Sequence, residues 1–219
     1  MNNIWGLIVS YVFIFLVIGI STVLQKKNVL KDEGARKFIH IGVAHWWIIA
    51  MVFFDNVYFA IIPPITFIIL NYASYKMNLI KSMERGGKGN LGTVYFPISL
   101  LILVLLTFTD VIGASTYIGA IGILIMGYGD GLAAVIGKKY GKHPLAFGKS
   151  FEGSITMFIV SFLVTFTILV RYGSLVSAVL VGLGVAIAGT VIELFTPKGL
   201  DNLTVPLGTA ILAFILLLI

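Results

Sequence analysis

The chain has 219 residues, of which 59% are apolar and only 11% are charged, and its mean hydropathy is +1.06. Soluble domains carry about 25% charged residues, so this composition excludes a soluble globular protein and indicates an integral membrane protein. The absence of cysteine excludes disulfides, thiolate metal sites and a cysteine nucleophile. The net charge of +6 does not indicate a nucleic-acid partner, because the basic residues are spread over loops between apolar segments.

Apolar segments follow one another along the chain, most of them close to the roughly 20 residues that cross a bilayer as a helix. They predict an all-α, polytopic membrane protein with about eight spans. We expect one domain over residues 1–219, with the first helix peripheral and residues 35–219 as the core. The first segment lacks a basic leading region and an obvious small-residue cleavage site, which favours a true helix over a signal peptide. The predicted spans cover residues 5–24, 38–54, 57–73, 93–109, 115–137, 154–171, 174–195 and 203–219.

The basic residues alternate between the connections. All Lys and Arg residues except Arg171 lie in four alternate loops, at residues 25–37, 74–92, 138–153 and 196–202. Cytoplasmic loops of membrane proteins are enriched in Lys and Arg. The alternation therefore predicts that these loops are cytoplasmic and that both termini are on the non-cytoplasmic side of the membrane. It also supports the count of eight, because a miscounted span would break it.

The first basic loop leads into a helix that carries a candidate phosphate site. Arg36 and Lys37 lie at its cytoplasmic mouth. His40 lies about one turn further in, on the same helical face as Arg36, because residues four apart are neighbours on a helix. His45, on the same predicted helix, is interpreted as a packing residue whose ring bonds to a nearby carbonyl.

Two cytoplasmic helix starts share the pattern Lys-x-x-x-Gly-[Ser/Thr], at residues 88–93 and 149–154. Ser and Thr are good N-caps, and a helix start with free N–H groups, a glycine and a lysine suits phosphate. The alternative is two capped helices with ordinary cytoplasmic lysines. The shared pattern of six residues is too short to establish an internal duplication.

The segment Gly148-Lys149-Ser150 ends as a nucleotide-binding P-loop ends. The pattern G-x-x-x-x-G-K-[ST] would need a glycine where His143 stands, and Gly141 lies two residues too early. No soluble strand is expected before it either. A P-loop is therefore excluded, and any phosphate binding here is expected to use the helix start instead.

An acidic residue lies near the cytoplasmic end of the fifth predicted span, in Gly129-Asp130-Gly131. Carboxylates within membrane helices are costly and usually functional. The flanking glycines leave room for a ligand or metal, and Mg²⁺ is a natural partner for the acid. Two alternatives remain: the glycines serve close helix packing, and Asp130 pairs with a loop lysine. Further polar residues near the same cytoplasmic end are Glu152, Glu193, Asp201 and Asn202.

Basic groups for phosphates, acids for a metal and a histidine are thus predicted to gather at one face of the membrane. Phosphoryl transfer needs mainly charge neutralisation, Mg²⁺ and an in-line hydroxyl. A lipid alcohol could reach such a site from the bilayer and a nucleotide from the cytoplasm. A small transporter is the alternative from another class, but it predicts ionisable groups near mid-membrane that both faces can reach.

Five segments resemble, in order, the signatures of the family that contains dolichol kinase, phytol kinase and the CTP-dependent diacylglycerol kinase. They are Ala-Arg-Lys-Phe-Ile-His (35–40), Gly-Thr-Val-Tyr-Phe-Pro (92–97), Gly-Asp-Gly-Leu-Ala-Ala-Val-Ile-Gly (129–137), Gly-Lys-Ser-Phe-Glu-Gly-Ser (148–154) and Asp-Asn-Leu-Thr-Val-Pro (201–206). The resemblance implies a membrane kinase that uses CTP to phosphorylate a lipid alcohol. The chain is shorter than dolichol kinases, so phytol, a shorter polyprenol and diacylglycerol stay open as acceptors. The related phosphatidate cytidylyltransferases, which also use CTP, rank second because their longer, more acidic C-terminal signature is missing.

With this resemblance the polar residues receive expected roles. Asp130, Glu152 and His40 are predicted to be catalytic. The predicted Mg²⁺ ligands are Asp130, Glu152 and Glu193. The residues predicted to bind nucleotide or phosphate are Arg36, Lys37, Lys88, Gly92, Thr93, Gly129, Gly131, Lys149, Ser150, Gly153, Ser154, Asp201 and Asn202. The bilayer is the expected surrounding and the oligomeric state is left open.

Overall fold

The computed structural model describes residues 2–77, 91–109, 113–197 and 199–219, and these ranges are almost entirely helical. They contain no β-strand; a single isolated bridge pairs Pro144 with Ser150. The all-α class predicted from the sequence is confirmed over this part of the chain. The helices are α1 (Asn3–Lys26), α2 (Asp32–Ala44), α3 (Trp46–Phe53), α4 (Val57–Ala60), α5 (Ile62–Met77), α6 (Gly92–Thr107), α7 (Thr116–Leu124), the π-helix η1 (Ile125–Asp130), α8 (Gly131–Tyr140), the 3₁₀ turn η2 (Ala146–Gly148), α9 (Phe151–Tyr172), α10 (Leu175–Phe195) and α11 (Asp201–Leu218).

Each predicted span falls on helical structure, although the bounds and continuity differ. Six helical stretches among the described residues are long and apolar enough to cross a membrane: 3–26, 57–77, 116–140, 151–172, 175–195 and 201–218. The fourth predicted span is the shorter apolar helix α6, of 16 residues, and the second is divided into α2 and α3 at His45. Helices α2 and α9 also begin earlier than predicted, at Asp32 and Phe151.

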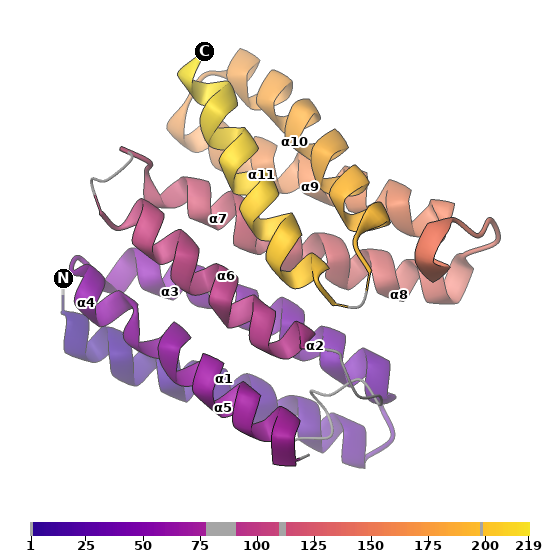
Figure 1. Ribbon diagram of the computed structural model, residues 1–219, viewed down its shortest axis with the longest axis horizontal. Helices are drawn as coiled ribbons and strands as arrows, with labels where there is room; N and C mark the ends of the chain where they lie inside the picture. The colour runs from indigo at the N-terminus through magenta and orange to yellow at the C-terminus, as the bar shows by residue number, and fades with distance from the viewer. Residues whose placement is uncertain (1, 78–90, 110–112, 198) are drawn as a thin grey trace.

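The stretch α7–η1–α8 forms the centre of the molecule. In its apolar window 72% of residues are buried, against 22–33% in the other long apolar helices. Figure 1 shows it running between the N-terminal helices, drawn from indigo to magenta, and the C-terminal helices α9 to α11. The outer faces of the surrounding helices carry many exposed large apolar side chains, as expected for surfaces in contact with lipid.

Glycines allow this central stretch to approach its neighbours closely. A Cβ atom at Gly127 would lie 2.3 Å from the Ala44 Cβ atom of α2, and one at Gly131 would lie 2.6 Å from the Ile41 side chain. A Cβ atom at Gly129 would lie 2.7 Å from the sulfur of Met157 on α9. These contacts support the packing alternative for the glycines that flank Asp130.

A hydrogen-bonded pair links the break between α2 and α3 to the π-helix. The His45 Nδ1 atom lies 2.9 Å from the Ile41 carbonyl oxygen, and the Tyr128 hydroxyl lies 2.5 Å from His45 Nε2. Because a carbonyl can only accept, Nδ1 donates and Nε2 accepts from the tyrosine. The interpretation of His45 as a packing residue bonded to a carbonyl is confirmed. The π-helix adds a local change of register immediately before Asp130, as π-bulges at functional sites often do.

Candidate active site

Two pockets of opposite chemistry meet at one pair of residues. An apolar pocket lies among α1, α2, α5 and α6, and a polar pocket lies among α2, α8, α9 and the turn between α10 and α11. Their volumes are about 930 Å³ and about 1320 Å³, both including space open to the surroundings. Lys37 and Asp130 are the residues that line both pockets.

Lys37 and Asp130 form a buried ion pair. The Lys37 Nζ atom lies 2.5 Å from Asp130 Oδ2 and 3.4 Å from the Asp130 carbonyl oxygen. Only 4% and 7% of the two side chains are exposed, so water screens their attraction little. The sequence had offered an ion pair with a loop lysine as the alternative for Asp130. The structure confirms that alternative: the partner is Lys37, the last residue of the predicted loop 25–37, which lies within α2 because this helix begins at Asp32.

His40 lies one turn beyond Lys37 on α2 and faces the same carboxylate. Its Nε2 atom is 3.7 Å from Asp130 Oδ2, too far for a hydrogen bond, and is buried without a hydrogen-bond partner. Its ring packs against Phe96, with the ring centroids 4.9 Å apart. A buried polar atom without a partner is uncommon, and this one lies on the wall of the apolar pocket.

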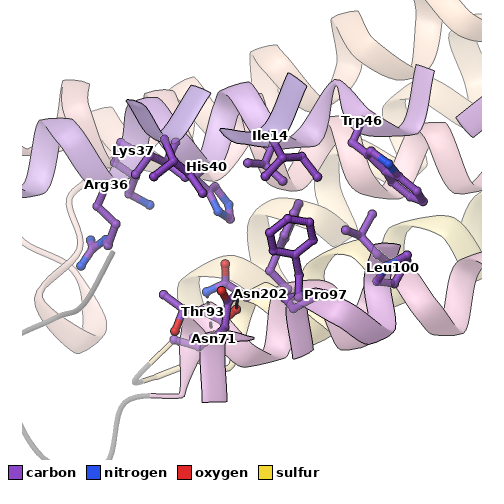
Figure 2. Close-up of a pocket in the computed structure, with 18 of the residues that line it drawn as sticks. Ile14, Arg36, Lys37, His40, Trp46, Asn71, Thr93, Pro97, Leu100 and Asn202 are labelled. Atoms are coloured by element: carbon purple, nitrogen blue, oxygen red, sulfur yellow. Dashed lines mark hydrogen bonds between the residues drawn. The ribbon is translucent and has the colours of Figure 1, made fainter. Parts of the chain in front are cut away.

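The apolar pocket changes character along its length. Figure 2 shows Arg36, Lys37 and His40 at one end, opposite Asn71, Thr93 and Asn202, and Ile14, Trp46 and Leu100 at the other end. The Asn71 side-chain amide donates to the Thr93 carbonyl at 2.7 Å, which joins α5 to α6 at the polar end. The pocket is therefore amphipathic, with an apolar body and a polar head beside Asp130.

The polar pocket is built around a second buried ion pair. Lys149 Nζ lies 2.6 Å from Glu193 Oε1 and also donates to the Glu193 carbonyl, at the C-terminal end of α10. The carboxylates of Asp130 and Asp201 lie close enough to Glu193 to interact with it electrostatically, and Lys149 interacts likewise with Asp130. Basic and acidic groups from α2, η1, α10, α11 and the loop before α9 thus converge on one pocket.

The helix start beside Lys149 differs from the predicted one. Ser150, not Ser154, is the N-cap of α9, and its Oγ atom accepts from the Gly153 N–H at 3.1 Å. Ser154 lies in the first turn, lines the pocket, and has a buried Oγ atom without a hydrogen-bond partner. On α6, Gly92 is the first helical residue and the N-cap position is Leu91, whose side chain cannot accept a hydrogen bond. The two helix starts are therefore not equivalent.

Most of the residues predicted for the site line one pocket or the other. In the polar pocket are Lys37, Asp130, Lys149, Ser150, Gly153, Ser154, Glu193 and Asp201. In the apolar pocket, besides the shared pair, are Arg36, His40, Gly92, Thr93 and Asn202. Gly92 and Thr93, predicted to bind phosphate, thus lie on the other side of the ion pair from Lys149. Lys88 lies outside the described residues.

Three predicted residues line neither pocket. Gly129 and Gly131 pack against Met157 and Ile41, as described above. Glu152 points to the loop between α8 and α9, where its Oε1 atom lies 2.8 Å from His143 Nδ1. Its predicted place beside Asp130 and Glu193 in a metal site is not what the structure shows. Within the described ranges no three His, Asp or Glu side chains form a ready metal-binding cluster.

The structure also adds pocket residues that sequence reasoning missed. Phe147 and Glu33 line the polar pocket, and Asn71 lies at the head of the apolar one. Asn71 is a polar residue in the third predicted span, a signal that could have been noticed. Glu33 lies in the first turn of α2, where it pairs with Arg36.

Comparison with known proteins shows which proteins this chain resembles in sequence. No family model and no solved structure matches the chain. A phytol kinase of Synechocystis sp. is 36% identical over 195 residues, which cover 87% of this chain and 82% of that protein. A probable chloroplastic phytol kinase of Zea mays is 30% identical over 88% of this chain and 70% of its own length, and phytol kinase 1 of Arabidopsis thaliana is 29% identical over 88% and 69%.

A helical membrane fold, two pockets joined at a charged pair and these similarities define a phosphotransferase of the lipid-alcohol kinase class. Within that class, the chain belongs to the phytol kinase family.

Proposed function

We propose that this protein transfers the γ-phosphoryl group of CTP to a single-chain isoprenoid alcohol such as phytol, at the cytoplasmic face of the membrane. The observation that carries the proposal is the meeting of an apolar and a polar pocket at Lys37 and Asp130. A lipid tail suits the first pocket and a nucleoside triphosphate suits the second. Their reacting ends would then lie together at the shared pair, which is the positioning that phosphoryl transfer requires.

The acceptor hydroxyl would lie between His40 and Asp130. His40 Nε2 has no protein partner, so a hydroxyl there would satisfy it and be held toward the carboxylate. The hydroxyl oxygen attacks the γ-phosphorus in line, its proton passes to Asp130, and the bond from phosphorus to the β,γ-bridging oxygen breaks. The products are a lipid monophosphate and a nucleoside diphosphate. The similarity to phytol kinases supports an acceptor with one isoprenoid chain rather than the two chains of diacylglycerol.

The basic residues of the polar pocket would hold the donor. Lys37 and Lys149 are both near Asp130 and would neutralise the oxygens of the transferred group. The buried Ser154 hydroxyl has no hydrogen-bond partner and belongs to the lining of the same pocket, so it would donate to a phosphate oxygen. CTP as the donor follows from the family resemblance, and the cytoplasmic face follows from the basic loops at this end of the helices.

The acidic residues of the pocket fit a Mg²⁺ ion that enters with the nucleotide. Glu193 and Asp201 line the pocket with Asp130, and Mg²⁺ bound to phosphates commonly uses only one or two protein carboxylates. Glu193 and Asp201 are the residues that would hold the ion. When bound, Mg²⁺ neutralises charge that builds up on the phosphate oxygens.

The test is transfer of labelled phosphate by the purified protein. The protein is incubated with Mg²⁺ and γ-labelled CTP or ATP, with phytol, a shorter polyprenol or diacylglycerol as acceptor, and lipid products are identified by mass. We expect labelled phytyl monophosphate with CTP. Absence of labelled lipid with every donor and acceptor would refute the kinase, and a cytidine-diphosphate lipid would point to a cytidylyltransferase instead.

A further inference from the structure

We propose that Phe147 is the stacking platform for the base of the nucleotide donor. This inference rests on the proposed function, because it assumes that the polar pocket binds a nucleotide. Phe147 lines that pocket, yet 62% of the residue is exposed. Within the described part of the chain no aromatic or cation–π contact involves it. A large apolar side chain is thus exposed to solvent at the mouth of a charged pocket.

The backbone at Phe147 has an unusual conformation. Its φ and ψ angles are 55° and 29°, in the left-handed region, and the next residue, Gly148, has a φ of 74°. A bulky residue with positive φ is uncommon, and such conformations persist where the surrounding structure enforces them, often at ligand sites. Glycine would adopt this turn without strain, so the turn itself gives no reason for a phenylalanine.

The loop that carries Phe147 is fastened at its base. The Leu145 N–H donates to the Lys149 carbonyl at 2.8 Å, and the Phe151 N–H donates to the His143 carbonyl at 2.9 Å. The hydrogen bond between His143 Nδ1 and Glu152 Oε1 holds the same base from the side of α9. The tip is therefore presented by a closed loop, which limits the ordering that a ligand would have to impose.

The position of the phosphates fixes where the base must lie. For transfer to the alcohol, the γ-phosphoryl group has to lie at the buried inner end, beside Lys37 and Asp130. The base then lies at the outer end, and the exposed Phe147, two residues before Lys149, is the aromatic residue that lines the pocket there. Every nucleobase has a π-face, so stacking adds affinity without choosing between bases. The platform would bind CTP and other nucleotides alike, and other groups would select cytosine.

Kinetics of Phe147 variants test this assignment. We expect Phe147→Ala to raise the KM for CTP roughly 10- to 100-fold, the range that loss of one base–aromatic stack produces, with little change in the KM for the alcohol. Phe147→Trp should keep a KM for CTP near the wild-type value. Leu145→Ala removes an apolar side chain from the same loop, outside both pockets, and serves as the control that leaves both KM values unchanged.

Competitive inhibitors separate the base from the phosphates. Cytidine alone should inhibit the wild-type protein and lose at least tenfold in affinity with Phe147→Ala, whereas inorganic tripolyphosphate should inhibit both proteins equally. Equal cytidine inhibition and an unchanged KM for CTP would overturn the assignment. A selective rise in the KM for the alcohol would also overturn it and would indicate a membrane-surface role for Phe147. If the wild-type protein transfers no phosphate at all, it is the proposed function that fails.

Discussion

The ion pair between Lys37 and Asp130 contributes to the packing of two helices and also lies in the candidate active site. It joins α2 to the end of the π-helix, and it lies on the boundary between both pockets. Removing one partner of a buried pair leaves the other charge unpaired, which typically costs about 3–5 kcal/mol. A single substitution therefore risks confusing lost stability with lost catalysis.

A variant with both residues replaced separates the loss of stability from the loss of catalysis. We expect Asp130→Asn to lower the thermal midpoint, because Lys37 is left unpaired, and to abolish phosphoryl transfer, because the proposed proton acceptor is gone. Adding Lys37→Met removes the stranded charge and should restore most of the midpoint without restoring activity. The midpoint is measured by thermal unfolding in detergent and the activity by the labelled-lipid assay. Substantial activity in either variant would remove Asp130 from the reaction.

Glu152 offers a sharp contrast to Asp130, since the sequence predicted a catalytic and metal-binding role for both. The structure places Glu152 on His143, at the base of the loop that carries Phe147 and Lys149. We expect Glu152→Gln to keep the Mg²⁺ dependence of the wild-type protein and to raise the KM for CTP by only a few fold, because the loop is held less firmly. A rise of about tenfold or more in the Mg²⁺ concentration needed for half-maximal rate would show that Glu152 is a metal ligand after all.

At the scale of the helices, the position of Asp130 depends on how closely the central stretch approaches α2. Gly127 lies against Ala44 with no room for a side chain, since an added Cβ atom would be 2.3 Å from the Ala44 Cβ atom. Neither atom belongs to a flexible side chain, so the two helices would have to move apart. Lys37 and Asp130 lie on these same two helices, so the distance between Lys37 Nζ and Asp130 Oδ2 would increase as the helices move apart.

Gly127→Ala is therefore expected to destabilise the protein by about 1–3 kcal/mol, as overpacking of a dense interior does, and to reduce kcat. Gly19→Ala on α1 is the matched control, because an added Cβ atom there meets nothing within 4 Å, and it should change neither quantity. Thermal midpoints and single-substrate kinetics of both variants decide this. Equal midpoints for the two variants would show that the helices adjust without cost.

Helices were the easiest features to predict from the sequence, and the reason is physical. A backbone in lipid has to satisfy its own hydrogen bonds, so each long apolar run had to be helical. The break at His45, the π-helix and the early starts of α2 and α9 depend on side-chain contacts between helices. The Tyr128–His45 hydrogen bond spans 83 positions in the sequence, and no local pattern encodes such a contact.

The candidate site also combines features that a local sequence pattern predicts with features that depend on contacts between helices. Lys37, Asp130, Lys149 and Glu193 could be predicted because charge within an apolar chain is conspicuous. Their pairing, and the separation of Thr93 from the polar pocket, follow from which helices are neighbours. Phe147 escaped notice because one more phenylalanine is inconspicuous among 16 in an apolar chain. Its meaning depends on its exposure and backbone conformation, which only a structure gives.

At the scale of the whole molecule, the two pockets have to be accessible from two different environments. The apolar pocket must be reached from the bilayer, and the polar pocket must be reached from the compartment that supplies nucleotide. Figure 1 shows both termini in the left half of the view, whereas the loops that join α1 to α2 and α8 to α9 lie at the right. The basic residues Lys138, Lys139 and Lys142 lie at that right-hand end, at or just beyond the end of α8.

Single cysteines test whether this end faces the cytoplasm, and the chain, which has none of its own, needs no prior engineering. Lys142→Cys lies in the exposed loop between α8 and α9, and Asn2→Cys lies at the exposed N-terminal end. In sealed right-side-out vesicles, a membrane-impermeant maleimide should label the Asn2→Cys variant and spare Lys142→Cys. Inverted vesicles should give the opposite pattern, and detergent should make both sites reactive. Labelling of both variants from the same side would mean that the number of crossings between them is even, and a reversed pattern would place the nucleotide pocket on the non-cytoplasmic face.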